Sequence, residues 1–217
     1  MSAVLPRPGV SRWPVPPLLW ATAAIHAGAL VLLLAAPAHW GWALAALVAN
    51  HAVLTAVGLW PRSTALGENL VRLPEAAAAR REVALTIDDG PDPEVTPTVL
   101  DLLDAAGARA TFFCIAERAE RHPQLVREIV RRGHSVQNHT HAHSHRFSLL
   151  GPRGFAREIE AAQHVLSGLT GEAPRFFRAP AGLRNPFLAP VLHRLGLTLA
   201  SRPGRKHRRA RSSPASN

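Results

Sequence analysis

Two adjacent carboxylates stand where a short apolar run ends. The run covers residues 83–87 and is followed by Asp88, Asp89, Gly90 and Pro91, a pattern that predicts a strand entering a turn. Adjacent carboxylates at a strand end can take different roles, since one can bind a metal ion while its neighbour stays free as a base. Taken alone, the same four residues are also typical of a plain polar turn.

A histidine-rich loop follows a second predicted strand at residues 134–137. His139 and His143 are four residues apart, a spacing that would place both imidazoles on one face of a helical turn and suits a divalent ion. His141 and His145 have the same spacing, and a histidine-rich loop can also bind metal without a dedicated site. The spacing predicts a metal site but does not choose between the two pairs.

A third candidate set follows the predicted strand at residues 175–177. It is Arg178 followed by Ala-Pro-Ala-Gly up to residue 182. An arginine at a strand end can orient a carboxylate, and the proline and glycine restrain a loop whose backbone N–H groups can face a substrate. In isolation this segment too is typical of an ordinary loop.

Strands and helices alternate from residue 81 onward, which indicates βα units and a parallel sheet or barrel. The predicted strands are residues 83–87, 110–115, 134–137, 175–177 and 197–200. The predicted helices are residues 96–106, 117–132, 154–169 and 186–195. In parallel α/β folds, catalytic residues gather at the carboxyl ends of strands, and all three candidate sets lie at such ends.

Together and in this order, the three sets resemble those of the polysaccharide deacetylases, the NodB-homology domain of carbohydrate esterase family 4. Residues 86–91 resemble the family's Thr-Phe-Asp-Asp-Gly-Pro motif, with Ile87 in place of the aromatic residue. Residues 139–143 resemble its His-Ser/Thr-x-x-His motif, and residues 178–182 its Arg-x-Pro-x-Gly motif. The resemblance implies an α/β fold with a (β/α) barrel of the deacetylase type.

The resemblance also implies which histidines bind the metal. Asp89, His139 and His143 would hold a divalent ion, usually zinc, while His141 and His145 would be bystanders. Such an ion polarises an acetamide carbonyl and lowers the pKa of its bound water.

The remaining roles in the implied reaction fall to the other motif residues. Asp88 would be the general base, held in place by Arg178. The loop of Ala181 and Gly182 would face the substrate, and the backbone N–H near Ala181 would help to stabilise the oxyanion. The products would be acetate and a free amine on a polysaccharide or lipid-linked saccharide.

Two further motifs of the family do not occur in this sequence: Asp-x-x-Asp-Trp, and a late Leu-x-His that carries the general acid. The family's barrel also has more strands than the five predicted here. We therefore expect that a frame shift near Ser201 removed the last part of the domain, leaving an incomplete barrel with an open sheet edge and impaired turnover. The alternatives are a non-catalytic membrane protein that keeps a residual metal-binding fold, and a membrane protein that handles metal through the histidine cluster.

Two uncharged stretches, residues 18–36 and 40–60, each have about the length of a bilayer-spanning helix. Tryptophans lie near their predicted ends, as in an aromatic belt, and the two stretches predict a transmembrane hairpin. Buried core helices and a cleaved signal peptide are the alternatives. The polar residues inside the spans, His26, Asn50 and His51, are expected to contact one another or to tilt toward the interface.

The arginines around the hairpin predict its orientation. Arginines precede and follow it, and the connecting turn has no lysine or arginine. By the positive-inside bias, both outer ends and the downstream domain are predicted to be cytoplasmic.

The basic charge of the chain is concentrated at one end. The 217 residues include 25 Lys and Arg against 15 Asp and Glu, a net charge of +10, and residues 202–217 contain six of the basic residues and no acidic one. This pattern predicts a solvated tail, and no basic stripe with interleaved aromatic residues supports nucleic-acid binding. Cys114 is the single cysteine, which excludes an intrachain disulfide and a multi-cysteine zinc site. The predicted organisation is an N-terminal tail (1–16), a membrane hairpin (17–60), a linker (61–80), a partial deacetylase domain (81–201) and a basic disordered tail (202–217).

Overall fold

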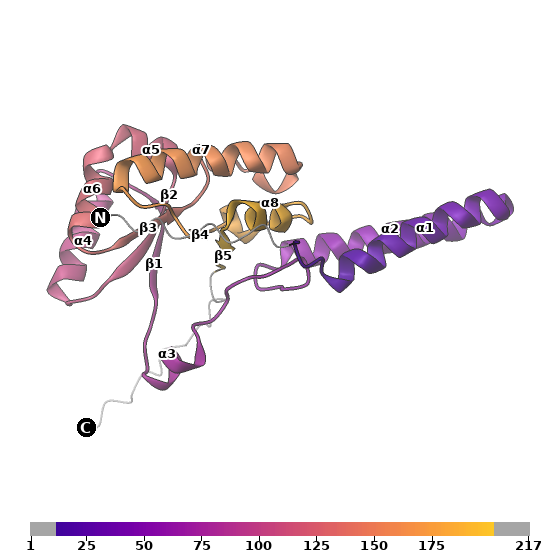
Figure 1. The fold of residues 1–217 in the computed structure, drawn as a ribbon, viewed down its shortest axis with the longest axis horizontal. Helices are drawn as coiled ribbons and strands as arrows, with labels where there is room; N and C mark the ends of the chain where they lie inside the picture. The colour runs from indigo at the N-terminus through magenta and orange to yellow at the C-terminus, as the bar shows by residue number, and fades with distance from the viewer. Residues whose placement is uncertain (1–11, 202–217) are drawn as a thin grey trace, which may run out of the picture.

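The computed structural model describes residues 12–201, so the predicted basic tail and most of the predicted N-terminal tail lie outside the described residues. A helical hairpin projects from one end of an α/β domain (Figure 1).

A five-stranded parallel sheet forms the centre of the α/β domain, and its strands lie side by side in sequence order. The strands are β1 (Leu85–Gly90), β2 (Ala110–Cys114), β3 (Ser135–Asn138), β4 (Phe176–Phe177) and β5 (Thr198–Leu199). All five predicted strands are present, each displaced by a few residues at most. The predicted α/β class with a parallel sheet is confirmed.

One layer of helices covers one face of this sheet. The helices are α4 (Val95–Ala105), α5 (Ala116–Arg121), α6 (Pro123–Arg131), α7 (Pro152–Thr170) and α8 (Leu188–Leu195). Phe112 and Cys114 of β2 pack with Val136 of β3 against α4, α6 and α7, and a second core with Phe177 of β4 lies against α7 and α8. Because neighbouring strand residues point to opposite faces, residues such as Phe113 face the uncovered side, where the candidate site lies.

The helix predicted over residues 117–132 is two helices in the structure. α5 ends at Arg121 and α6 begins at Pro123, with His122 between them at φ −131° and ψ 55°. Proline lacks the N–H that a continuous helix needs, and its ring disfavours a helical conformation at the residue before it. The prediction of a single helix followed the apolar spacing and gave too little weight to Pro123.

The two uncharged stretches form α1 (Pro17–Ala35) and α2 (Trp40–Leu59), which lie antiparallel and are joined by the short turn η1 (Pro37–His39) (Figure 1). Both helices are long and apolar enough to cross a membrane by length and composition. Within the most apolar stretch of each helical segment, only 6% of α1 and 17% of the segment Pro37–Leu59, which contains α2, are buried inside the structure. Such low burial does not fit the alternative of two buried core helices.

Of the three polar residues predicted to contact one another inside the hairpin, His26 and His51 do so, whereas Asn50 contacts Thr22. The Thr22 hydroxyl donates to the Asn50 side-chain carbonyl at 3.1 Å. The rings of His26 and His51 meet edge to face, with centroids 5.3 Å apart.

Part of the segment predicted as a linker, residues 61–80, belongs to the domain instead. Leu66 is buried, and the Asn69 amide donates to two backbone carbonyls of the same segment. The Leu70 N–H donates to the Leu199 carbonyl at 2.8 Å, and the Leu70 carbonyl accepts from the Ser201 N–H at 3.0 Å. Leu70 therefore lies beside β5 like a one-residue strand and covers part of the sheet edge that was expected to be open. A short helix, α3 (Glu75–Ala79), follows before β1.

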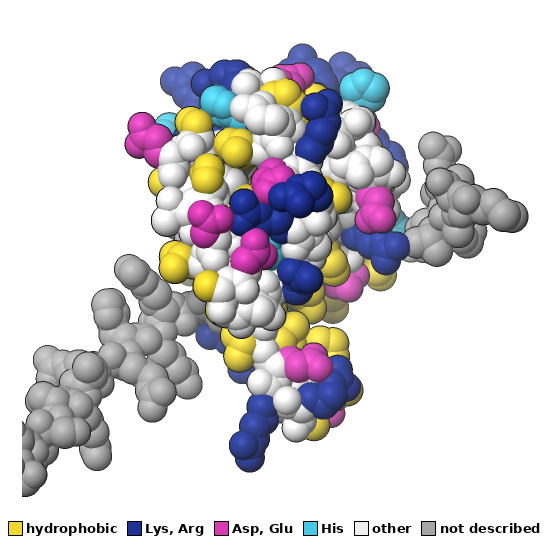
Figure 2. Space-filling view, turned by 90° about the vertical axis from the view of Figure 1, so that its left-hand side faces the viewer, with side chains coloured by type: hydrophobic (Ala, Val, Ile, Leu, Met, Phe, Trp, Pro, Cys, Tyr) yellow, Lys and Arg dark blue, Asp and Glu magenta, His cyan; other side chains and the backbone are white. Residues whose placement is uncertain are grey.

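The end of the domain opposite the hairpin is a solvated, charged surface. Figure 2 shows basic and acidic side chains interspersed over it. On this end Arg132 bonds to Asp101, Asp104 and Glu128, linking α4 to α6. Hydrogen bonds from Arg131 and Arg132 lower the pKa of Glu128 to about 2.

Candidate active site

An irregularity at the end of β1 points the two adjacent carboxylates in different directions. Asp88 lies opposite Phe113 of β2, but Gly90 lies opposite the very next residue, Cys114, so Asp89 is an extra residue in the ladder. Asp89 adopts a left-handed conformation with φ 66°, which is uncommon for residues other than glycine. Its side chain is 53% exposed, whereas that of Asp88 is 3% exposed. The bulge thus gives two consecutive aspartates two environments.

The histidine loop after β3 is held by hydrogen bonds from Asn138 and Thr140. The Asn138 side-chain carbonyl accepts from the Thr140 N–H at 2.9 Å, and the Thr140 hydroxyl accepts from the His143 N–H at 2.9 Å. Thr140 and His143 both have positive φ, 68° and 51°. The predicted helical turn is therefore wrong, since a tight loop with two left-handed residues brings His139 and His143 together. Left-handed residues outside glycine cluster at functional sites.

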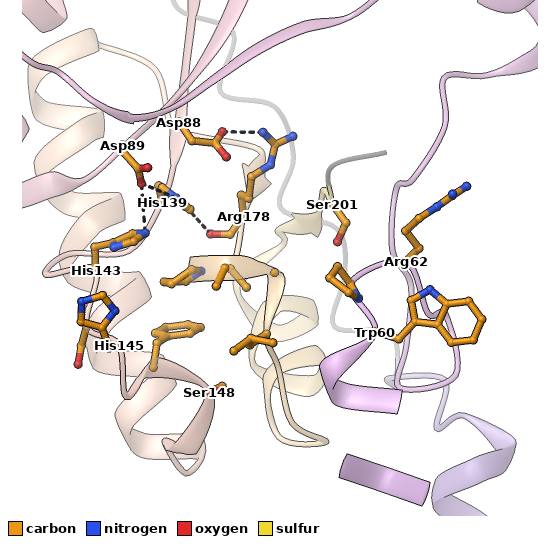
Figure 3. Close-up of a pocket in the computed structure, with 18 residues that line it drawn as sticks. Trp60, Arg62, Asp88, Asp89, His139, His143, His145, Ser148, Arg178 and Ser201 are labelled. Carbon is orange, nitrogen blue, oxygen red and sulfur yellow. Dashed lines mark hydrogen bonds and ion pairs between the residues drawn. The ribbon is translucent and has the colours of Figure 1, made fainter. Parts of the chain in front are cut away.

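Asp89, His139 and His143 converge on one point (Figure 3). The Nε2 atoms of both histidines lie 3.2 Å from Oδ1 of Asp89, and the three nearest donor atoms all lie within 4.8 Å of one another. Two imidazole nitrogens and one carboxylate oxygen, with room left for further ligands, suit a catalytic zinc ion.

The hydrogen bonding of His139 fits this use. Its Nδ1 lies 2.8 Å from the Arg178 carbonyl, which can only accept, so Nδ1 carries the proton and the Nε2 lone pair faces Asp89. Metal-binding histidines commonly orient their second ring nitrogen in this way. Burial lowers the pKa of His139, which favours the neutral form that binds metal.

The other two histidines of the loop are not part of this cluster. His141 faces Glu117 and Glu120, at 3.8 and 3.6 Å. His145 lines the same cavity but lies beyond His143 (Figure 3). The structure therefore groups Asp89 with His139 and His143, the pair that the resemblance favoured.

Asp88 and Arg178 form a buried ion pair beside this cluster. Nη1 of Arg178 lies 2.6 Å from Oδ1 of Asp88, and both side chains are almost fully buried. The Arg178 guanidinium also donates to the Thr86 hydroxyl at 3.0 Å and to the Ala200 carbonyl at 3.1 Å, and it lies 3.9 Å above the Phe113 ring. These contacts fix the orientation of the Asp88 carboxylate.

The contacts of Thr86, Phe113 and Ala200 with Arg178 were not predicted from the sequence, although Thr86 is the first residue of the first motif. The alternation of β1 and β2 carries a signal for the first two, because residues on the uncovered face of neighbouring strands must surround whatever Asp88 contacts. Ala200 comes directly after β5 at the far edge of the sheet, and no local pattern indicates its contact with Arg178.

A cavity of about 740 Å³ connects these groups. Ala181 and Gly182 line this cavity together with Asp88 and Asp89. Ala181 has φ 53° and Gly182 has φ 72°, so this loop too turns through left-handed residues.

The cavity also has a wall that the sequence reasoning missed. Trp60, Pro61 and Arg62, which directly follow α2, line it opposite the histidines (Figure 3). A Cβ atom on Gly182 would lie 2.8 Å from the Pro61 ring, so the motif loop packs directly on the segment that leaves the hairpin.

An open parallel sheet with this Asp–His–His cluster and a neighbouring Asp–Arg pair defines a hydrolase-type α/β site. Residues 75–200 match the family model described as polysaccharide deacetylase, and the chain belongs to this family of hydrolases that act on N-acetyl amide bonds. The resemblance inferred from the motifs is thereby confirmed.

Curated relatives share the same segment. A peptidoglycan-N-acetylglucosamine deacetylase of Bacillus cereus is 41% identical over 103 residues, which are 48% of this chain and 37% of the relative. A chitooligosaccharide deacetylase of Sinorhizobium fredii is 40% identical over 112 residues, 51% of this chain and 52% of the relative. The chain thus spans about half or less of the length of these relatives.

Solved structures show the same fold. A family 4 carbohydrate esterase from Streptomyces lividans in complex with acetate has 38% identity and a TM-score of 0.51, over 54% of this chain and 60% of that one. The Bc1960 peptidoglycan N-acetylglucosamine deacetylase has 30% identity and a TM-score of 0.53, over 59% and 65%.

Proposed function

We propose that this protein is a metal-dependent deacetylase that hydrolyses N-acetyl groups on the amino sugars of a polysaccharide or lipid-linked saccharide. The observation that carries the proposal is that a metal-type cluster and a separately buried carboxylate share one cavity. The cluster is Asp89, His139 and His143, and the carboxylate is Asp88. Membership of the deacetylase family supports the same reaction.

Each residue of the site has a separate role in the proposed reaction. A divalent ion held by Asp89, His139 and His143, for which we propose zinc, would polarise the acetamide carbonyl and acidify a water. Asp88 accepts the proton of the attacking water, and Arg178 keeps that carboxylate in position. The backbone N–H near Ala181, in the loop with Gly182, donates to the oxygen on which negative charge develops.

The test is acetate release by the full chain in detergent. Zinc-loaded protein is expected to release acetate from an N-acetylglucosamine oligomer, and removal of the metal by a chelator is expected to abolish release until zinc is restored. We expect a slow rate, because these 217 residues contain no Leu-x-His motif and a general acid typically contributes about 10²–10⁴-fold. Stoichiometric zinc binding without any acetate release would instead support the non-catalytic alternative.

We further propose that residues 17–60 are a membrane hairpin, that residues 61–80 lead from it, and that the domain of residues 81–201 is cytoplasmic. The exposed apolar surfaces of α1 and α2 support insertion, and the flanking arginines support the orientation. A reporter that works only outside the cytoplasm, fused after Leu73, should therefore stay silent. A signal from this reporter would show that the domain lies outside the cytoplasm and would contradict the proposed orientation.

A further inference from the structure

A second cavity, of about 630 Å³, lies between the hairpin and the α/β domain. The hairpin contributes Leu19, Leu54 and Leu59 to its wall, and the domain contributes apolar residues of the segments 148–149 and 183–190. Ser148 and Leu183 line both this cavity and the metal-site cavity. The two cavities therefore adjoin.

Arg184 is one of the residues that line the apolar cavity, and its positive charge has no acidic partner in the described part of the chain. The residue is 6% exposed, its Nε atom has no hydrogen-bond partner, and Nη2 donates to the Ser63 carbonyl. Within residues 12–201 no carboxylate forms an ion pair with it. Burial lowers its pKa, yet an arginine stays protonated at neutral pH.

A buried charge without a partner is costly unless a ligand compensates it. A phosphate oxygen suits a guanidinium in charge and geometry. Arg62, which is exposed, adds a positive charge to the wall of the metal-site cavity.

The apolar cavity opens where the proposed membrane spans begin. Leu149 and Phe187 of the domain are 81% and 50% exposed, and Leu59 at the end of α2 is 59% exposed. All three line this cavity. Exposed apolar side chains gathered beside a membrane hairpin are placed to contact hydrocarbon.

We propose that the saccharide substrate is joined through a phosphate to a lipid. The hydrocarbon chain lies in the apolar cavity, the phosphate pairs with Arg184, and the N-acetyl sugar enters the adjoining metal-site cavity. This proposal rests on the proposed deacetylation and narrows its substrate to a membrane-bound saccharide. A phospholipid of the bilayer has the same phosphate and chain, and the experiment separates the two.

The test measures binding, so that it does not depend on turnover. The full chain carrying Asp88→Asn is placed in phosphatidylcholine nanodiscs, and three probes are compared. They are an N-acetylglucosamine disaccharide linked through phosphate to a farnesyl chain, the disaccharide phosphate without the chain, and the disaccharide on the chain through a neutral ether. The complete probe is expected to bind at least about tenfold more tightly than either partial probe. Equal dissociation constants for all three would overturn the proposal.

Variants locate the binding. Arg184→Gln is expected to remove the advantage that the phosphate gives, and Phe187→Ser to weaken binding of the farnesyl probes about tenfold. Leu102→Ser, at a 66% exposed position on α4, is the matched control. It should leave the dissociation constants of all three probes unchanged. If Arg184→Gln fails to fold, Phe187→Ser still tests the cavity, because its exposed side chain is not part of the core.

Two further arms separate the remaining outcomes. Phosphatidylglycerol in the nanodisc and farnesyl phosphate are compared as competitors of the complete probe. If both displace it equally well, the cavity binds phospholipids of the bilayer and the substrate assignment is overturned. If the zinc-loaded native chain deacetylates a soluble oligomer with the same kcat/KM as the complete probe, the lipid requirement fails while the deacetylase proposal stands. Preferential binding of the complete probe without acetate release would contradict the deacetylase proposal and leave the lipid site intact.

Discussion

Replacing Asp88 with asparagine is expected to lower kcat for acetate release by about 10²–10⁴-fold, the usual contribution of a general base. Asparagine has nearly the same shape but does not accept a proton from water. Zinc affinity should change far less than kcat, because Asp88 pairs with Arg178, whereas the carboxylate beside the two histidine nitrogens is that of Asp89. Acetate release under saturating substrate and zinc titration of the same sample measure the two quantities.

The substitution also leaves the buried Arg178 without its carboxylate, which can cost about 3 kcal/mol of unfolding free energy. The double variant Asp88→Asn with Arg178→Met removes both charges and is the control for this effect. It should recover thermal stability relative to the single variant and remain inactive. If Asp88→Asn keeps more than about a tenth of the native kcat, Asp88 is not the base.

Replacing Asp89 with alanine is expected to weaken zinc binding by at least about 100-fold. Changes to residues that merely support a metal ligand already cost about 10–100-fold, and Asp89 would be a direct ligand, 3.2 Å from both histidine nitrogens. Competition with a chromogenic zinc chelator gives the affinity directly. Because the Asp89 side chain is half exposed, the variant should still fold, although alanine suits the left-handed conformation of this residue less well than aspartate does.

His141→Ala is the matched control for this experiment. His141 belongs to the same loop but faces Glu117 and Glu120, so its loss should leave zinc affinity unchanged. A large effect of His141→Ala together with a small effect of Asp89→Ala would show that the metal binds to the histidine-rich loop without using the β1 bulge.

The elements that the sequence predicted well are those whose signals are local. The strand of residues 110–114 is rich in β-branched and aromatic residues, and the helices that flank it show apolar residues at helical spacing. The break at Pro123 was also visible locally, but apolar spacing continued across it and outweighed the proline.

The site was predictable as a set of residues and less so as a geometry. By spacing alone, the pair His139 and His143 and the pair His141 and His145 were equally good candidates for metal ligands. A separation of four residues gives no information about the left-handed conformations of Thr140 and His143. The two roles of Asp88 and Asp89 depend on a register shift against β2, which involves a partner strand more than twenty residues away in the sequence.

The contacts of the segment after the hairpin had no sequence signal at all. Its prolines, glycine and alanines are typical of a linker, and nothing in them shows that Leu70 pairs with β5 or that Pro61 touches Gly182. Such pairings arise from the tertiary structure and become visible only in three dimensions.

The packing of Pro61 on Gly182 and of Leu70 on β5 means that the helical hairpin and the α/β domain are not independent modules. A soluble fragment that begins at residue 75, where the family match starts, would keep Asp88, Asp89 and the histidines but lose one wall of the cavity and the cover of the sheet edge. Swapping the hairpin for an unrelated membrane anchor would have the same effect unless the new segment reproduced these contacts. A fragment meant to keep the complete site therefore has to begin no later than Trp60, directly after α2.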